Sequence, residues 1–377
     1  MRHCRVCDRL LERCLLELNS MPASAQSLPT REALDTDHSL DLRVYQCEAC
    51  GLVQLDCEPV SYYREVIRAT AYSPEMKAFR LTQLEAFVNT HSLKGKKVLE
   101  IGCGRGEYLG LLQESGLLPV GTEYGAANIA AAREAGYQVE SMFPDAQAQG
   151  LEGSPFAAFF TFNFMEHWPD PRTVLIHVGK QLAEDSVGLV EVPNFDMLYE
   201  KKLSTEFIAD HLSYFTTQSL RTLLELSGFD VLEIREIWYR YILSATVRKR
   251  KTLNFEPFKD TLAQQKAKLS HFIEKAGHAG VAIWGAGHQA LAAIALMGLA
   301  EHVRYVIDSA PFKQGRYTPA SKLPIVAPET LEADPVSSII IMAAGFSDEV
   351  ARQIKQRWGD RFSLAILRED HVEEVPL

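Results

Sequence analysis

The chain has 377 residues, of which 47% are hydrophobic and 23% charged, and its formal net charge is −10. At about 150 residues per domain, this length predicts two to three domains. The composition is that of an ordinary globular protein and excludes disordered, collagen-like and low-complexity chains. The acidic balance argues against a long duplex-DNA footprint, which needs a basic face, and we expect no nucleic-acid partner.

The sequence contains no run of about 18 uncharged apolar residues, so we expect no membrane span. The first residues, Met1-Arg2-His3-Cys4, lack the apolar stretch of a secretory signal peptide. We therefore expect a cytoplasmic protein, in which closely spaced cysteine pairs indicate metal ligands rather than disulfides. The sequence carries no indication of an oligomeric state.

Residues 1–65 contain six of the seven cysteines and few helical patterns. Four of these cysteines form the pairs Cys4-x-x-Cys7 and Cys47-x-x-Cys50, a spacing that aims both sulfurs of a pair at one ion. We predict a zinc-binding domain whose closed site of four thiolates serves folding and not catalysis. The alternative is four unligated core cysteines.

Residues 66–250 alternate apolar, strand-like runs with amphipathic, helix-like stretches. Strands separated by helical patterns of about 10–15 residues predict a parallel, doubly wound sheet. The expected strands are 97–101, a run ending near 121–123, 156–162 and 188–192, and the expected helices are 107–116 and 126–135.

Residues 251–377 form a second, smaller α/β block, which follows a basic run at 248–251 that we interpret as a solvated linker face. A second glycine-containing loop, between an apolar run and a helical pattern, repeats the strand–loop–helix arrangement of the middle block. The expected elements are a helix at 258–276 and strands at 281–284, 303–307 and 337–342.

The first glycine-rich loop follows the first predicted strand of the middle block and contains Gly102, Gly104 and Gly106. Glycines let the backbone pass close to a ligand, and the loop leads into a helix N-terminus. Glu123 ends the next predicted strand, where a carboxylate can accept both ribose hydroxyls of an adenosine. The acid Glu100 and the glycine spacing depart from the pattern of NAD-binding loops, and S-adenosylmethionine fits better. The predicted cofactor-binding residues are Glu100, Gly102, Gly104, Gly106, Glu123, Tyr124, Phe143, Asn163 and Met165.

Two histidine-containing segments follow later strands. His167 comes after the strand at 156–162, at the carboxyl edge that faces the ligand crevice, and is a candidate base or substrate-binding group. The alternative is a histidine that packs or caps beneath the loop. In the second segment Asp210 precedes His211, and a neighbouring carboxylate can hold the tautomer of an imidazole and raise its basicity. Adjacent residues rarely point the same way, so the alternative is that no such dyad forms.

Over nearly its full length, the chain resembles the sugar C-methyltransferases that act on nucleotide-activated deoxy-ketosugars. That family joins a four-cysteine zinc domain, a class I S-adenosylmethionine domain and a C-terminal Rossmann-like domain, in the order of the three blocks here. The segments Trp284–Gly287, Asp308–Arg316 and Leu323–Ile325 are similar to three segments of the family's C-terminal domain. The resemblance implies an α/β, class I methyltransferase fold with S-adenosylmethionine and structural zinc as cofactors. The implied domains are 1–65, 66–250 and 251–377.

The family's catalytic segment is matched in part. His211 is retained and Asp210 replaces a glutamate, while Ile208 and Ala209 stand where the family has tyrosine and histidine. These two differences put the C-methylation assignment in question and leave the methyltransferase assignment intact.

Two further family residues have candidates elsewhere in the chain. His167 matches a family histidine that follows the fourth strand. A family tyrosine precedes the methyltransferase core, and Tyr72 is our candidate for it, with Tyr62 and Tyr63 as weaker ones.

The resemblance implies methylation of a nucleotide-activated 4-keto-deoxysugar at carbon. The sugar loses the proton beside its carbonyl, and the enolate attacks the sulfonium methyl group, which requires a base and a donor for the enolate oxygen. We expect His211 to be the base, with Tyr72 as the alternative. His167 and Asn163 are expected to orient or stabilise the oxygen.

The C-terminal domain is implied to help bind the nucleotide diphosphate. Lys313 and Arg316 are its candidate phosphate partners, and Tyr214 is a further candidate for substrate binding. Ordinary surface charge is the alternative for the two cations. Two other functions remain open: O- or N-methylation of a sugar or other small polar acceptor, and a catalytically silent module that binds a nucleotide sugar or a protein.

Overall fold

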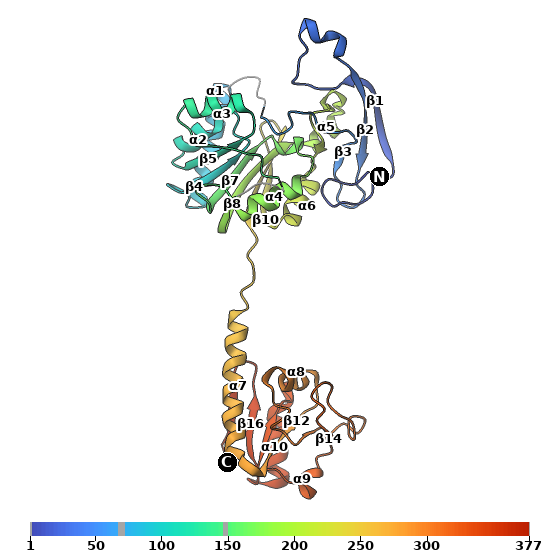
Figure 1. The fold of residues 1–377 in the computed structure, drawn as a ribbon, viewed down its shortest axis with the longest axis vertical. Helices are drawn as coiled ribbons and strands as arrows, with labels where there is room; N and C mark the ends of the chain where they lie inside the picture. Colours follow the sequence, from blue (N-terminus) through green and yellow to red (C-terminus); the bar gives the residue numbers. More distant parts are fainter. Residues whose placement is uncertain (1, 67–71, 146–149, 377) are drawn as a thin grey trace. The chain divides into compact units, whose positions relative to one another are not determined.

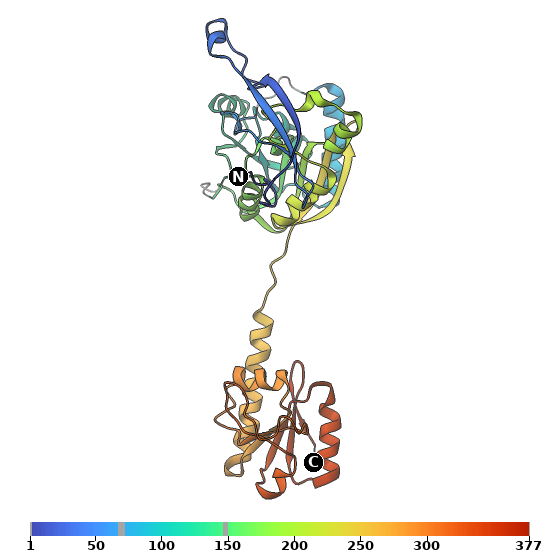
Figure 2. The ribbon, with the colours of Figure 1, turned by 90° about the vertical axis from the view of Figure 1, so that its right-hand side faces the viewer.

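The computed structural model describes residues 2–66, 72–145 and 150–376. Contacts between Cα atoms divide the chain into two compact units, Met1–Lys251 and Thr252–Leu377, which are described separately below. Figures 1 and 2 show the elements of both units in two views.

A seven-stranded sheet forms the centre of the first unit, in the order β10-β11-β8-β7-β4-β5-β6 (Figure 1). Its five strands β8, β7, β4, β5 and β6 run parallel, and β11 is antiparallel to both β8 and β10. This confirms the predicted parallel sheet and adds an antiparallel hairpin at one edge. The strands are β4 (Lys97–Ile101), β5 (Leu118–Glu123), β6 (Val139–Ser141), β7 (Phe156–Phe162), β8 (Leu182–Pro193), β10 (Phe229–Ile237) and β11 (Ile242–Lys249).

Helices cover both faces of this sheet, because its central strands are apolar on both sides. β7 reads FAAFFTF, and most of its side chains are buried, as expected for the middle of a parallel sheet. One core cluster contains buried residues of α1, α2 and α3, and the other contains those of α4 and α6. The helices are α1 (Pro74–Thr90), α2 (Glu107–Glu114), α3 (Ala126–Glu134), α4 (Pro171–Lys180) and α6 (Thr217–Leu226).

In the first unit, two predicted elements differ in length from the observed ones by two residues or more. The strand expected at 188–192 begins at Leu182, because its first residue pairs with Phe156 of β7 and its later residues pair with β11. The helix expected at 107–116 ends at Glu114, because Gly116 has a φ of 86°, which a right-handed helix excludes.

A second sheet of the first unit combines N-terminal strands with one from the middle of the chain. Its order is β1-β2-β3-β9, with antiparallel pairing throughout. Figure 2 shows β1 and β2 as a long hairpin. The short strand β9 begins two residues after His211, so this sheet reaches the predicted catalytic segment. The elements of this region are β1 (Cys14–Pro22), η1 (Arg31–Thr36), β2 (Ser39–Gln46), β3 (Val53–Leu55), η2 (Met165–His167), α5 (Phe195–Lys201), η3 (Ser204–Glu206) and β9 (Ser213–Tyr214).

The second unit contains a six-stranded sheet in the order β14-β13-β12-β15-β16-β17, parallel except for β17. Helices α7 and α8 pack on one face, and α9 and α10 pack on the other. The strands are β12 (Val281–Trp284), β13 (Tyr305–Ile307), β14 (Ile325–Val326), β15 (Ser338–Ile341), β16 (Ser363–Leu367) and β17 (Val372–Val375). The helical elements are α7 (Glu256–Ala276), η4 (Gly277–Ala279), α8 (His288–Met297), α9 (Thr330–Ala333), η5 (Ala344–Phe346) and α10 (Ser347–Trp358).

Candidate active site

The glycine loop after β4 has a backbone that side chains would not tolerate. Gly102, Gly104 and Gly106 have φ values of 73°, 57° and 90°. A Cβ atom at Gly102 would lie 2.3 Å from Cδ1 of Phe164, and one at Gly106 would lie 2.4 Å from Cδ2 of Tyr137. The loop therefore packs directly on Phe164, which follows β7, and on Tyr137, which follows α3, so Gly102 and Gly106 leave no room for a side chain.

Glu123, at the end of β5, ties this loop to its neighbours. Its carboxylate accepts hydrogen bonds from the backbone N–H groups of Gly104 (2.9 Å), Tyr124 (3.1 Å) and Gly125 (2.9 Å). Burial raises the pKa of Glu123, and these backbone donors oppose the shift. The predicted ribose acceptor thus lies beside the glycine loop, as its position after Gly104 indicates.

The other predicted cofactor residues lie in different surroundings. Tyr124 is half exposed, and Phe143 is buried with its edge against Phe164. Met165 is fully buried in the core, and Asn163 ends β7 with a φ of 48°. Glu100 is buried within β4.

Arg64 is a residue of this region that no motif in the sequence indicated. Its guanidinium lies 5.4 Å from the ring centre of Tyr124 and 5.0 Å from that of Tyr63. It also pairs with Asp145 at 3.3 Å. Such a stack forms only when the chain before α1 folds onto the loops after β5 and β6, so local sequence does not predict it.

His167 and His211 meet beside the same sheet edge. Their ring centres are 4.8 Å apart and their planes are nearly perpendicular. His167 lies in η2, which follows β7, and its Nδ1 bonds to the backbone carbonyl oxygen of Asp210 at 2.8 Å. Because a carbonyl oxygen only accepts, Nδ1 carries the proton and Nε2 presents a lone pair.

Glu166 lies beside this pair, although no motif in the sequence indicates it. Its Oε1 lies 4.0 Å from Nε2 of His167, and one ligand atom from each of Glu166, His167 and His211 lies within 4.8 Å of the others. Burial raises the pKa of Glu166 to about 8 and lowers that of His211 to about 3, to which nearby His167 contributes. Burial also lowers the pKa of His167. Both imidazoles are therefore neutral at pH 7.

The structure separates the carboxylate of Asp210 from the imidazole of His211. The Asp210 carboxylate accepts hydrogen bonds from the Tyr62 hydroxyl (2.8 Å) and the Ala25 N–H (2.7 Å). The predicted dyad is replaced by another arrangement, in which the backbone carbonyl of Asp210 holds His167. Adjacent side chains point to different neighbours here, as the alternative interpretation stated.

The two tyrosines predicted as site residues, Tyr72 and Tyr214, each contact other residues of the first unit. Tyr72 stacks on Tyr108, with 6.0 Å between ring centres, in the core cluster of α1 and α2, whereas Phe164 and Met165 belong to the other cluster. Tyr214 is buried, and its hydroxyl accepts a hydrogen bond from the N–H of Ile208 at 3.0 Å. Burial raises the pKa of Tyr214.

In the second unit, the predicted phosphate partners differ in their surroundings. Lys313 Nζ bonds to Oδ2 of Asp308 at 2.8 Å, while Arg316 is exposed. Asp308 also accepts a hydrogen bond from the N–H of Ala286 in the second glycine-containing loop, at 2.9 Å. The charge of Lys313 is thus compensated within the unit.

The four cysteines predicted to bind zinc come together. Their sulfurs all lie within 4.8 Å of one another, with 3.4 Å between Cys4 and Cys50 and 3.5 Å between Cys7 and Cys47. Tetrahedral zinc at about 2.3 Å from each sulfur sets sulfurs about 3.8 Å apart, so the cluster fits this ion. The neighbouring Cys50 thiol lowers the pKa of Cys4, which favours the thiolate that a metal requires.

This cysteine cluster is linked to the histidine segments through backbone groups. Arg5, between the first two cysteines, donates to the carbonyl oxygens of Pro169 (3.0 Å) and Cys57 (3.1 Å). In β3, the N–H of Leu55 donates to the carbonyl oxygen of Leu212 (3.1 Å), whose own N–H donates to that of Glu166 (2.9 Å). The N-terminal sheet therefore supports both histidine segments.

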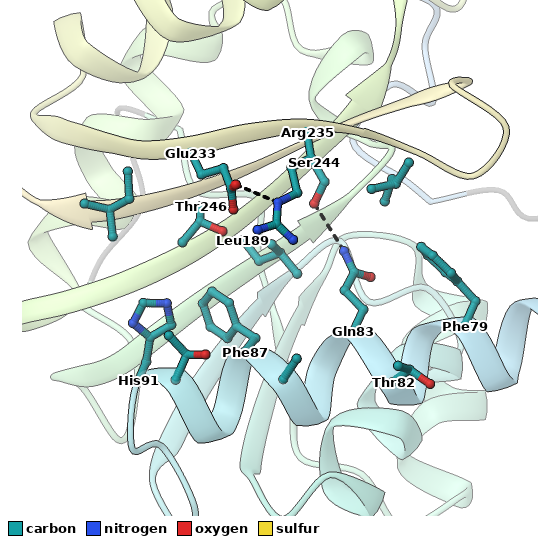
Figure 3. A pocket seen from close by; sticks show the side chains of 14 residues that line it. Phe79, Thr82, Gln83, Phe87, His91, Leu189, Glu233, Arg235, Ser244 and Thr246 are labelled. Carbon is teal, nitrogen blue, oxygen red and sulfur yellow. Dashed lines mark hydrogen bonds and ion pairs between the residues drawn. The ribbon is translucent and has the colours of Figure 1, made fainter.

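A groove of 660 Å³ lies elsewhere, between α1 and the strands β8, β10 and β11 (Figure 3). In this view Gln83 points from α1 toward Ser244, to which its amide donates at 3.2 Å. Gln83 also donates to Glu191, which forms a buried ion pair with Arg80. The described residues that line the groove include no candidate site residue, so its size alone does not mark the active site.

Two family models match the chain in sequence. The methyltransferase domain matches residues 75–234, and the C-methyltransferase C-terminal domain matches residues 245–366. In the described part of the chain, every helix is too short or too polar to cross a membrane.

Two curated relatives agree with these matches. The chain is 24% identical over 408 aligned positions to the C-methyltransferase NovU of Streptomyces niveus, covering 96% of this chain and 95% of that protein. It is 29% identical over 115 positions to a ubiquinone biosynthesis O-methyltransferase of Stutzerimonas stutzeri, covering 29% of this chain and 48% of that protein. The crystal structure of PH0226 from Pyrococcus horikoshii is 17% identical, with a TM-score of 0.40, and covers 51% of this chain and 97% of that one. The two domain matches and the relatives identify the chain as an S-adenosylmethionine-dependent methyltransferase, and its last third matches the C-terminal domain of the C-methyltransferases.

Proposed function

We propose that this methyltransferase transfers the methyl group of S-adenosylmethionine to a carbon beside the carbonyl of a nucleotide-activated 4-keto-deoxysugar. The observation that carries the proposal is the meeting of His167 and His211, 4.8 Å apart, beside the edge that bears the glycine loop. Because β4 and β7 are parallel neighbours, the loop after β4 and the histidine after β7 lie at the same carboxyl edge of the sheet, and we infer that they share one ligand crevice. The C-terminal domain match and the full-length similarity to NovU support carbon as the acceptor.

The donor end of this crevice is assigned to the glycine loop and Glu123. The glycines let the loop backbone lie close to the cofactor. The Glu123 carboxylate is assigned to accept hydrogen bonds from the ribose hydroxyls, which would replace bonds that it now accepts from backbone N–H groups. Bound there, S-adenosylmethionine supplies an electrophilic methyl group. The side chain of Phe143, buried against Phe164, keeps the floor of this region dry.

The acceptor end is assigned to the two histidines, which we place at the oxygen of the substrate rather than at its leaving proton. With its pKa lowered to about 3, His211 is a weak proton acceptor, so it is a poor general base. Burial also keeps His167 neutral, and its free nitrogen Nε2 offers a lone pair to the crevice.

We infer two further binding roles from the rest of the chain. The four-cysteine cluster holds a structural zinc ion, which fixes Arg5 and through it the loop after His167. The second unit binds the nucleotide diphosphate, with exposed Arg316 as a phosphate partner and Lys313 shared between phosphate and Asp308.

The experiment is mass spectrometry of products from a panel of nucleotide sugars, with methyl-labelled S-adenosylmethionine in deuterated water. We expect a product whose labelled methyl group is on carbon, as its fragments show, lost in His211→Ala and retained in His91→Ala, whose side chain lies in the groove of Figure 3. A labelled methyl group on oxygen or nitrogen would contradict carbon as the acceptor, and deuterium uptake beside the carbonyl reports enolate formation at any carbon that still carries a proton. An absence of labelled product from every sugar, with S-adenosylmethionine still bound, would refute the nucleotide-sugar assignment.

A further inference from the structure

Glu166, His167 and His211 form a cluster of metal-ligating side chains outside the cysteine site. One nitrogen or oxygen from each lies within 4.8 Å of the other two. Glu166 is 2% exposed, and the two histidines are partly buried. Two imidazoles and one carboxylate are the donor set of many catalytic zinc and non-haem iron sites.

His167 is already oriented as a ligand would be. A metal-bound histidine usually donates its second ring N–H to a carbonyl or carboxylate, which fixes the tautomer and the direction of the free nitrogen. Here Nδ1–H of His167 donates to the carbonyl oxygen of Asp210 at 2.8 Å, and Nε2 lies 4.0 Å from Oε1 of Glu166. The lone pair of Nε2 is therefore held beside the carboxyl group.

Glu166 supplies the second indication. Its Oε2 is buried and has no hydrogen-bond partner among the residues that the structure describes. A buried carboxyl oxygen without a partner is costly, and a bound cation removes that cost. The backbone around it is fixed, since Leu212 N–H donates to the carbonyl oxygen of Glu166 at 2.9 Å.

The chemistry of the acceptor creates a need for such a cation. Nε2 of neutral His167 is an acceptor, so it cannot donate a hydrogen bond to the oxygen of an enolate. Lone pairs facing that oxygen would repel its negative charge. A divalent cation between them would bind the nitrogens and the oxygen together and polarise the carbonyl as a Lewis acid.

We propose that Glu166, His167 and His211 bind one divalent transition-metal cation, distinct from the cysteine-bound ion, with open positions that take the acceptor's oxygen. Ligands at about 2.0–2.2 Å from a cation lie about 3.0–3.5 Å from one another, so Oε1 and Nε2 approach by roughly half an ångström. Rotation of the Glu166 and His211 side chains supplies this movement. The cation site itself follows from the cluster, and only the role of its open positions rests on the proposed function.

The test uses the whole chain with zinc already bound at the cysteines. Mn²⁺ is titrated into this protein, and bound Mn²⁺ is measured by electron paramagnetic resonance. We expect one bound Mn²⁺ per chain, displaced by Zn²⁺, in the absence of any methyl donor or acceptor. Glu166→Gln and His211→Ala should each weaken binding about tenfold or more. His91→Ala is the matched control, since this histidine lies on the far side of the sheet in the α1 groove, and it should bind Mn²⁺ as the wild type does.

The cation proposal and the proposed function fail in different ways. No bound Mn²⁺ at millimolar concentration, or binding equal in wild type, Glu166→Gln and His211→Ala, would overturn the cation site whatever the enzyme methylates. Methylation that continues undiminished after removal of this cation, with cysteine-bound zinc retained, would overturn the role of its open positions. Cation binding without methylation of any sugar would instead refute the proposed substrate and leave the cation site standing. Retained zinc content and unchanged thermal unfolding in both variants would exclude misfolding as the cause of lost binding.

Discussion

Both units of the chain end their second parallel strand with an acid that accepts a hydrogen bond from a glycine-containing loop. In the first unit, Glu123 accepts from the N–H of Gly104, and in the second, Asp308 accepts from the N–H of Ala286, each at 2.9 Å. The further bonds of Glu123 come from backbone groups, whereas Asp308 also binds the ammonium of Lys313. Both acids thus accept a hydrogen bond from a loop N–H group. Among the described residues, the negative charge of Glu123 has no side-chain cation bonded to it, whereas that of Asp308 is neutralised by Lys313.

The loops themselves differ in the same direction. All three glycines of the first loop have positive φ, whereas in the second Gly285 has a φ of 116° and Gly287, which caps α8, has one of −85°. The space beside Gly285 is filled by the backbone of Met342, because a Cβ atom at Gly285 would lie 2.6 Å from the carbonyl oxygen of Met342. Shared strand–loop–helix topology thus does not imply a shared ligand, and the charge and backbone of each loop decide what it can bind.

The largest effect should come from the cysteine cluster, which only the first unit contains. Cys50→Ser should remove the bound zinc and several kcal/mol of the stability of the first unit, because the ion's binding energy is folding energy. The unfolding transition of the second unit should not move. Zinc analysis and calorimetry of the full chain measure both. Cys14→Ser is the control, because this cysteine lies in β1 outside the cluster; an equal loss of zinc there would contradict the assignment.

The two loops can be compared by adding one methyl group to each. Gly102→Ala places an alanine in a left-handed backbone conformation and pushes its Cβ atom into Phe164. The change should therefore destabilise the first unit by about 2 kcal/mol or more and abolish S-adenosylmethionine binding. Gly287→Ala, with no atom within 4 Å of the added carbon and a negative φ, should cost about 1 kcal/mol or less. Denaturant unfolding and calorimetric titration with the cofactor provide the readouts. Equal effects of the two changes would remove the contrast between the loops.

Replacing each acid by its amide tests which carboxylate serves the methyl donor. Glu123→Gln places an N–H₂ group against backbone donors, and we expect at least about a tenfold loss in affinity for S-adenosylmethionine. Asp308→Asn should leave that affinity unchanged and release Lys313. Calorimetric titration measures both, and a loss of cofactor affinity in Asp308→Asn would place the donor site in the wrong unit.

The smallest effect concerns pH, and the two acids should respond in opposite directions. Burial raises the pKa of Glu123, so its contribution to stability is greatest at low pH and falls as the pH rises through its folded-state pKa. Burial opposes the shift at Asp308, but Lys313 and backbone donors outweigh it and lower the pKa, so that stabilisation is present at neutral pH and lost on acidification. The second unit of Asp308→Asn should therefore lose less stability below about pH 5 than that of the wild type. Unfolding of both proteins across the acid range measures the difference, and parallel curves would contradict it.

Features set by short stretches of sequence were predictable, and features set by distant contacts were not. Each cysteine pair is defined by a spacing of three positions, and the glycine loop and Glu123 by their spacing within β4–α2–β5, and the structure brings each set together. No local sequence pattern indicates Glu166, because its significance depends on His211, which lies on a different segment of the chain. Asp210 was paired with its neighbour in sequence, although its carboxylate binds Tyr62 and Ala25, which only the folded N-terminal region brings near.

The pairing of β3 with β9 has a consequence for synthesis of the chain. β3 (Val53–Leu55) leaves the ribosome well before β9 (Ser213–Tyr214), because residues 56–212 must be translated in between. At about 5–20 residues per second, that interval lasts roughly 10 to 30 s. Throughout it, the outer edge of β3 offers unpaired backbone groups to any passing strand. During that interval the nascent N-terminal sheet therefore needs protection, as by a chaperone, from pairing with other strands.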